Sequence, residues 1–413
     1  MYTSSHIASI LGTQCTFSPT RTILLILFSS LLLTIFFHKA SPVGPFYVAA
    51  LACVILTALA FLIPETFRLR PLFIFVFLAL TLLVLSDITS LLALNDNDRL
   101  YGLRRSLGFL LVFTATYFFA VATGIRKSLR FLIFIGTASL AIATINYFVT
   151  PILPYEEYAG SRGFRFTGFW VNPNRAAEAI TLVYCSGLFL AAVSSSARKS
   201  VDFLGALAVL ISCIILIYFT GSRAPVAAIY ASFLLSLFLL CLYAFRQRFR
   251  ATSLFSLAPL LLAPFLVIAA LSFLLLHKTE DTSFLPPFLL PELSWDPRDN
   301  IRFAIWNEHI SAFLADAKSF MLGGHQKNLP SPHNSYIYFF SLYGVFAIPI
   351  LACFGLLIAR SLTHAVPFLR IALSTGLLSW LIFGFGNDAL TQSYFAVALA
   401  FLVAMLTRPN KQS

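Results

Sequence analysis

Long apolar runs separated by short polar connections dominate the chain. Because about 20 residues of helix cross a bilayer, each run is close to the length of one membrane span. Backbone groups in hydrocarbon must be satisfied within their own segment, and the alternation typical of membrane β-strands is absent, so the runs should be helices. They lie near 22–37, 43–63, 71–92, 106–123, 128–150, 174–193, 201–220, 224–244, 253–276, 334–359, 364–384 and 389–407. The pattern predicts an all-α polytopic membrane protein with about 12 transmembrane helices.

One connection is much longer than the others and covers residues 277–332. It divides the chain into a first part, 1–276, with nine predicted spans, and a last part, 333–413, with three spans and a short tail. Long connections in compact proteins tend to be functional. The long loop is therefore the first place to search for chemistry.

Basic residues are distributed unevenly across the predicted membrane. With an even number of spans both termini lie on one side, and that side carries 15 basic and two acidic residues, a sum of +13. The other side carries 13 basic and 14 acidic residues, a sum of −1. The positive-inside rule then places both termini in the cytoplasm and the 277–332 loop on the outer side of the membrane.

Composition supports a membrane protein and narrows its chemistry. Hydrophobic residues make up 59% of the chain, charged residues 11%, and the mean hydropathy is +0.88, which excludes an ordinary soluble domain. The net charge of +12 follows from the topology, so nucleic acid is a poor partner. The six cysteines form no C-x-x-C pair, so neither a metal site nor a disulfide framework is indicated.

The long loop contains one helix that can be predicted closely. Asp296 suits the N-cap, Pro297 suits the first helical position, and Gly323-Gly324 would end the helix. Several large or basic side chains follow at steps of three or four and share one face. The alternative to a functional role for this face is that the helix is amphipathic and lies on the membrane surface. The residues of that face are Arg298, Arg302, Trp306, His309 and Phe313.

Arginines recur on the predicted outer side. Arg162 and Arg165 lie in "GSRGFRFTGFWVNPNR", and Arg223 lies in "TGSRAP" between two apolar runs with scarcely any loop. Arginine presents a rigid fork that matches phosphate oxygens, so these residues could bind a phosphate-rich ligand. The alternative is that their side chains only extend to the membrane–water interface. Asp96 and Asp98 form a D-x-D that could instead hold a divalent cation on a diphosphate.

Four stretches together resemble the bacterial O-antigen ligase family, within the wider group of O-antigen ligases and polymerases. They are "TGFWVNPNRAA" with Pro173-Asn174, "FTGSRAPVAAIYA", the "NIRFAIWNEH…FMLGGH" stretch, and His333-Asn334 followed after nine residues by Gly344. The likeness covers roughly residues 160–345. The predicted layout of twelve spans also matches that of the family along the whole chain. One departure is Ala347, which stands where the family often has a second glycine.

The resemblance implies a GT-C-like glycosyltransferase of the bacterial inner membrane that needs no metal or other cofactor. It would move O-antigen from undecaprenyl diphosphate to a sugar of lipid A–core on the periplasmic face. Membrane lipids would surround the enzyme. His333 would be the catalytic base, because an imidazole accepts protons near neutral pH. The expected diphosphate ligands are Arg223 and Arg302, with Arg162, Arg165 and Arg298 beside them. The expected supporting residues are Asn334, Tyr336, Trp306 and Asn174.

Three other functions fit part of the pattern. An O-antigen polymerase would use the same donor but pass the glycan to a second lipid-linked repeat. A protein O-oligosaccharyltransferase would usually carry a longer C-terminal region than the six residues after Thr407. A polysaccharide or lipid transporter should show repeated halves, and the sequence has no internal repeat.

Overall fold

The computed structural model is helical wherever it describes regular structure. Helices and their caps account for nearly all of the described chain. The described residues are 19–37, 45–63, 69–94, 99–149, 166–168, 170, 172–196, 200–222, 224–229, 231–232, 236, 301–323 and 332–407.

The first seven apolar runs correspond to helices α2 to α8. Four of these helices, α2, α3, α4 and α7, begin at a proline, whose fixed φ and missing N–H suit the first helical position. Gly124, with a φ of 88°, separates α5 from α6. The helices are α2 (Pro19–Phe37), α3 (Pro45–Leu62), α4 (Pro71–Leu94), α5 (Arg99–Thr123), α6 (Ile125–Phe148), α7 (Pro173–Ser196) and α8 (Ser200–Phe219).

The C-terminal part contains the loop helices and the last spans. Residues 224–229 of the eighth run are helical, and the run 253–276 lies outside the described residues. The elements are α12 (Ile301–Leu314), α13 (Ala317–Leu322), α14 (Ser335–Tyr343), the 3-10 turn η3 (Gly344–Phe346), α15 (Ala347–Leu362), α16 (Pro367–Gly386), the 3-10 turn η4 (Ala389–Thr391) and α17 (Ser393–Leu406).

Within the described part of the chain, seven helices are long and apolar enough to cross a membrane. Three shorter apolar helices are Thr22–Phe37, Tyr47–Leu62 and Ser393–Leu406. The chain is therefore a multi-pass helical membrane protein, as the apolar runs predict. The number of 12 spans stays a prediction.

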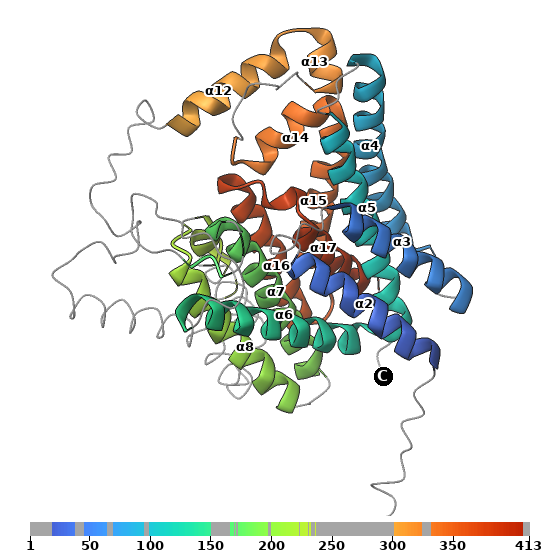
Figure 1. The fold of residues 1–413 in the computed structure, drawn as a ribbon, viewed down its shortest axis with the longest axis vertical. Helices are drawn as coiled ribbons and strands as arrows, with labels where there is room; N and C mark the ends of the chain where they lie inside the picture. The colour runs from blue at the N-terminus through green and yellow to red at the C-terminus, as the bar shows by residue number, and fades with distance from the viewer. Residues whose placement is uncertain are drawn as a thin grey trace, which may run out of the picture.

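The core lies around α7 and α17. Every residue of α17 from Tyr394 to Met405 is buried, and α17 packs against both α5 and α7. Nearly all of the apolar part of α7 is buried between α6, α8 and α16. A helix that is apolar all round belongs in an interior. Figure 1 shows α16 and α17 inside the bundle and α12 and α13 at one end of the molecule, beside α14.

The prediction of one long loop helix is wrong, because two helices replace it. The chain leaves α12 after Leu314, and Asp316 adopts an extended conformation with φ −154° and ψ 165°. Its Oδ1 accepts a hydrogen bond of 2.7 Å from the N–H of Ser319 and so caps α13. An aspartate side chain that bonds to nearby backbone offers an alternative to continuing the helix. The expected start at Asp296 and Pro297 lies outside the described residues.

The run predicted near 334–359 forms one candidate span, Ser335–Leu362, but it is not one regular helix. α14 ends at Gly344, whose φ of 57° is in the left-handed region, and η3 joins α14 to α15. A Cβ on Gly344 would lie 2.5 Å from the carbonyl oxygen of Met321. A Cβ on Gly323, which has a φ of 84°, would likewise collide with the carbonyl of Leu342. The two glycines therefore let the backbone of α13 pack against the break between α14 and α15.

We expect Gly344→Ala to destabilise the protein and Gly355→Ala not to. A left-handed conformation costs an alanine about 1–2 kcal/mol, and the added methyl would also collide with the Met321 carbonyl. Gly355 lies inside α15, where an added Cβ would have nothing within 4 Å, so alanine there should gain up to about 1 kcal/mol of helix propensity. Thermal unfolding of both purified variants in detergent measures the difference. Equal unfolding temperatures would contradict the close packing at Gly344.

Candidate functional site

His333 lies in a tight turn before α14 and its side chain is exposed. Its φ of 47° makes it the one residue other than glycine with a positive φ among the described residues. Such conformations are uncommon outside glycine and often mark functional sites. The preceding carbonyl, that of Pro332, accepts a hydrogen bond of 2.7 Å from Trp306 Nε1 of α12. Trp306 thus fixes the turn that presents His333.

Asn334 and Tyr336 build the same turn. The Oδ1 of Asn334 accepts hydrogen bonds from the N–H groups of Tyr336 at 3.0 Å and Ile337 at 3.2 Å, so Asn334 is the N-cap of α14. The Tyr336 hydroxyl donates to the carbonyl of Leu381 in α16 at 2.8 Å. These two side chains support the turn, and His333 stands at the positive end of the α14 dipole.

Ser335 ties this turn to the connection between α16 and α17. Both its N–H, at 3.0 Å, and its hydroxyl, at 2.8 Å, donate to the carbonyl of Asn387. The hydroxyl also accepts from the N–H of Leu390 at 3.1 Å. The residues next to His333 are therefore held against residues 387–390.

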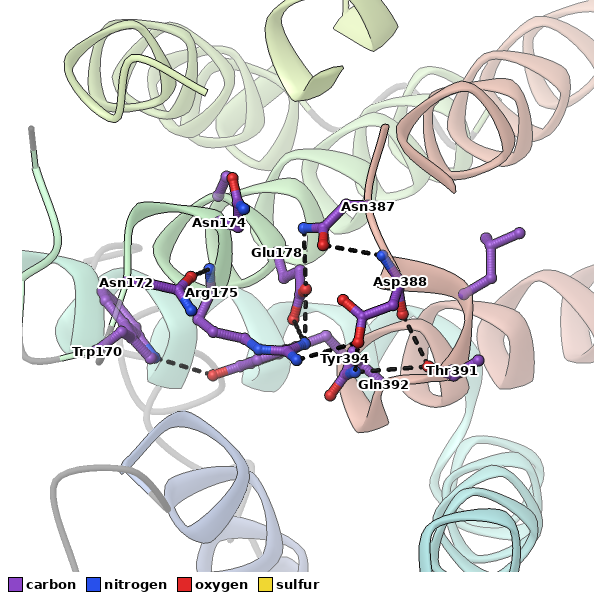
Figure 2. A network of polar contacts seen from close by, with 12 residues as sticks. Trp170, Asn172, Asn174, Arg175, Glu178, Asn387, Asp388, Thr391, Gln392 and Tyr394 are labelled. Carbon is purple, nitrogen blue, oxygen red and sulfur yellow. Dashed lines mark hydrogen bonds and ion pairs between the residues drawn. The ribbon is translucent and has the colours of Figure 1, made fainter. Parts of the chain in front are cut away.

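A buried charge network, composed of Arg105, Arg175, Glu178 and Asp388, lies directly beyond Asn387. The carboxylate of Asp388 contacts Arg105 at 2.9 Å and Arg175 at 3.3 Å, while Arg175 binds both oxygens of Glu178 at 2.8 and 2.9 Å. Figure 2 shows Arg175 between the two carboxylates. Glu178 is fully buried, and the other three side chains are only 13–15% exposed.

Arg105 connects the buried charge network to α14. Its Nη1 donates to the hydroxyl of Tyr338 at 2.7 Å, and its Nε donates to the carbonyl of Thr391 at 3.3 Å. Asp388 also accepts from Gln392 Nε2 at 3.3 Å. Since Tyr338 lies on the first turns of α14, the network contacts the helix that begins at the His333 turn.

Groups of opposite charge face one another in the network. Burial by itself would raise the pKa of Asp388, but the guanidiniums of Arg105 and Arg175 outweigh it and hold that pKa well below its usual range. Asp388 is therefore ionised at physiological pH. Two arginines face two carboxylates, and removing one member of such a buried set leaves a charge without compensation.

Two of the motif stretches meet beside this network. The Ser222 hydroxyl donates to Oδ1 of Asn174 at 2.7 Å, and the N–H of Phe166 donates to the carbonyl of Phe219 at 2.9 Å. A Cβ on Gly386 would collide with the Ala224 side chain. The residues on both sides of position 223 therefore contact Asn174, next to Arg175, and Gly386, next to Asn387.

The start of α7 explains the "WVNPNR" stretch. Asn172 Oδ1 accepts from the N–H of Arg175 at 3.0 Å, as an N-cap does, and Pro173 occupies the first helical position. Trp170 Nε1 donates to the Tyr394 hydroxyl of α17 at 3.0 Å. These contacts position Arg175 and Glu178 in the first turns of the helix.

The expected site residues separate into two groups. His333, Asn334 and Tyr336 lie together at the start of α14, where Trp306 of α12 donates to the Pro332 carbonyl. Asn174 lies beside Arg175 in α7. Arg302 belongs to α12, but its side chain lies outside the described residues, as do Arg162, Arg165, Arg223 and Arg298, together with Asp96 and Asp98. The diphosphate contacts expected of these arginines stay a prediction. Within the described ranges, no group of three His, Cys, Asp or Glu side chains forms a metal site.

None of the four members of the buried charge network is among the site residues expected from the sequence. Glu178 had a usable signal, because a carboxylate inside an apolar span is rare and usually functional. Arg105 and Asp388 lie at the edges of apolar runs, where charges are common. His309, on the predicted loop helix, is buried in the structure.

Comparisons with known proteins do not assign a family. No family model matches the chain, and no curated protein matches it.

Proposed function

We propose that this protein is an O-antigen ligase, a glycosyltransferase that moves O-antigen polysaccharide from undecaprenyl diphosphate to a hydroxyl of lipid A–core. The observation that carries the proposal is the attachment of the exposed His333 turn to a buried charge network at the ends of α5, α7 and α16. This polar arrangement stands in a bundle whose core is mostly apolar. It fits the order of the motifs that resemble the ligase family.

The proposed reaction needs a base and a set of cations. His333 removes the proton from the acceptor hydroxyl as that oxygen attacks the anomeric carbon, and the bond from this carbon to the diphosphate breaks. Direct displacement inverts the anomeric centre. Fixed cations aimed at the departing diphosphate contribute several kcal/mol. In this proposal Arg223 and Arg302 supply that charge, with Arg162, Arg165 and Arg298 near them, and no metal is required.

The proposal places the His333 turn in the periplasm and both termini in the cytoplasm, and cysteine labelling tests this. In a cysteine-free variant, Asn307→Cys on α12 should react with a membrane-impermeant thiol reagent in spheroplasts. Thr363→Cys, between α15 and α16, should react only after the membrane is opened. Both positions are exposed, so accessibility of the side chain does not distinguish them. The opposite labelling pattern would invert the topology and remove the proposal.

Gene deletion followed by gel analysis of lipopolysaccharide tests the function. A ligase predicts that lipid A–core carries no O-chain in the deletion strain and that the intact gene restores the full ladder. Core that carries single repeats would indicate a polymerase instead. An unchanged ladder would exclude both.

A further inference from the structure

A second feature lies at the opposite ends of α6 and α8 from the His333 turn. The two helices flank an open groove of about 500 Å³. Its walls are apolar or small, and they include Ile133, Phe134 and Ala141 of α6, Gly205 and Val209 of α8, and Leu190 of α7. A Cβ added to Gly205 would have nothing within 4 Å, so the glycine leaves space that a side chain could fill.

Two arginines and one carboxylate form a cluster at the mouth of this groove. Asp202 accepts hydrogen bonds from Arg126 Nε at 2.8 Å, from Arg130 Nε at 2.9 Å and from the Ser194 hydroxyl at 3.3 Å. Asp202 thus holds Arg130 at the groove, where the arginine side chain is still 50% exposed. The two arginines and the one carboxylate leave a local charge of 2 − 1 = +1.

The dimensions of the groove match one leaflet of a bilayer. Its α6 wall runs from Arg130 to Ala141, a distance of about 17 Å at 1.5 Å per residue. One leaflet is about 15 Å thick, half of the hydrocarbon core. The cationic mouth lies at the helix ends, and the apolar walls extend from it toward the middle of the membrane. An occupant would therefore have an anionic head and an apolar tail about one leaflet long.

We propose that this groove binds one anionic phospholipid from the leaflet on the arginine-rich side. The lipid phosphate would lie against the exposed part of the Arg130 guanidinium, which can donate two parallel hydrogen bonds. One acyl chain would lie between α6 and α8, over Leu190. The site is separate from the His333 turn and does not depend on the proposed transferase function.

Lipid binding to the purified, delipidated full-length protein in detergent tests the site. We compare phosphatidylglycerol with phosphatidylcholine of identical chains by native mass spectrometry and by the shift in unfolding temperature. The wild type should prefer phosphatidylglycerol. Arg130→Gln should weaken phosphatidylglycerol about fivefold, because one basic residue near anionic lipid contributes about 1 kcal/mol. Phosphatidylcholine should lose less, because the choline cation offsets the charge of its phosphate. Arg130→Lys should restore most of the preference.

Two further variants separate the groove from general surface charge. Gly205→Leu fills the groove without a clash and should reduce binding of both lipids. Arg360→Gln removes an exposed basic residue at the end of α15, away from the groove, and should leave the lipid preference as in the wild type. Equal affinity for the two lipids, or equal effects of Arg130→Gln and Arg360→Gln, would overturn the proposal. So would a Gly205→Leu protein that changes its oligomeric state but binds lipid normally, since the groove would then be an interface between copies.

Discussion

Replacing His333 with alanine should reduce glycan transfer by a factor of about 10² to 10⁴, the usual contribution of a positioned general base. The fold should survive, because the cap of α14 is made by Asn334 and the turn is bonded through the Pro332 carbonyl. Transfer by purified protein measures the rate, and the unfolding temperature verifies the fold. An alanine variant with wild-type activity would remove His333 from the mechanism.

A control separates the imidazole from the unusual backbone of this residue. At a φ of 47°, alanine is strained, whereas asparagine and glycine adopt left-handed conformations more readily. We therefore expect His333→Asn and His333→Gly to fold at least as well as the alanine variant and to be equally inactive. Recovery of activity in either variant would show that the turn conformation matters and the proton transfer does not.

Replacing Asp388 with alanine should destabilise the protein by about 3–5 kcal/mol, the cost of breaking a buried ion pair. Arg105 and Arg175 both contact this carboxylate, so both guanidiniums would lose compensation inside the bundle. Thermal unfolding in detergent measures the change. Asp316→Ala is the control: that carboxylate is exposed and caps α13, and its loss should cost much less stability than the loss of Asp388.

The pH dependence of the same ion pairs has a defined sign. Because the pKa of Asp388 is lowered in the folded protein, its contribution to stability is complete above the ordinary aspartate pKa of about 3.9. The contribution is lost only as the pH falls below that value toward the folded pKa. Titration of Asp388 should therefore not change the unfolding temperature between pH 8 and pH 5.

An Asp388→Ala protein as stable as the wild type would contradict the role assigned to the network.

Much of the fold could be predicted from the sequence, since lipid as a solvent demands long apolar helices. Seven of the expected runs coincide closely with α2 to α8, and Pro173 and Asn334 begin or cap helices as their residue types indicate. The breaks at Asp316 and Gly344 were not predictable by hydropathy. Each depends on a local backbone conformation, and at Gly344 a contact from a distant segment, the Met321 carbonyl, supports it.

The candidate site was predictable only in part. His333 and Trp306 stood out because of their place in motifs, and the structure joins them through the Pro332 carbonyl. The Arg105–Asp388 pair joins residues 283 positions apart, and no single-sequence pattern brings them together. Asn334 and Tyr336 were expected to support His333, and their polar atoms bond to the backbone of α14 and of α16.

Reconstituted transfer is the measurement that tests the central claim most directly. Purified protein would be given an undecaprenyl-diphosphate-linked O-antigen and lipid A–core in excess EDTA, with the His333→Asn protein as the matched control. The account predicts that capped lipid A–core forms with the wild type and not with the variant. No product with wild type in EDTA, but product once Mg²⁺ or Mn²⁺ is added, would contradict the metal-independent mechanism. No product under any condition with a folded protein would contradict the ligase itself.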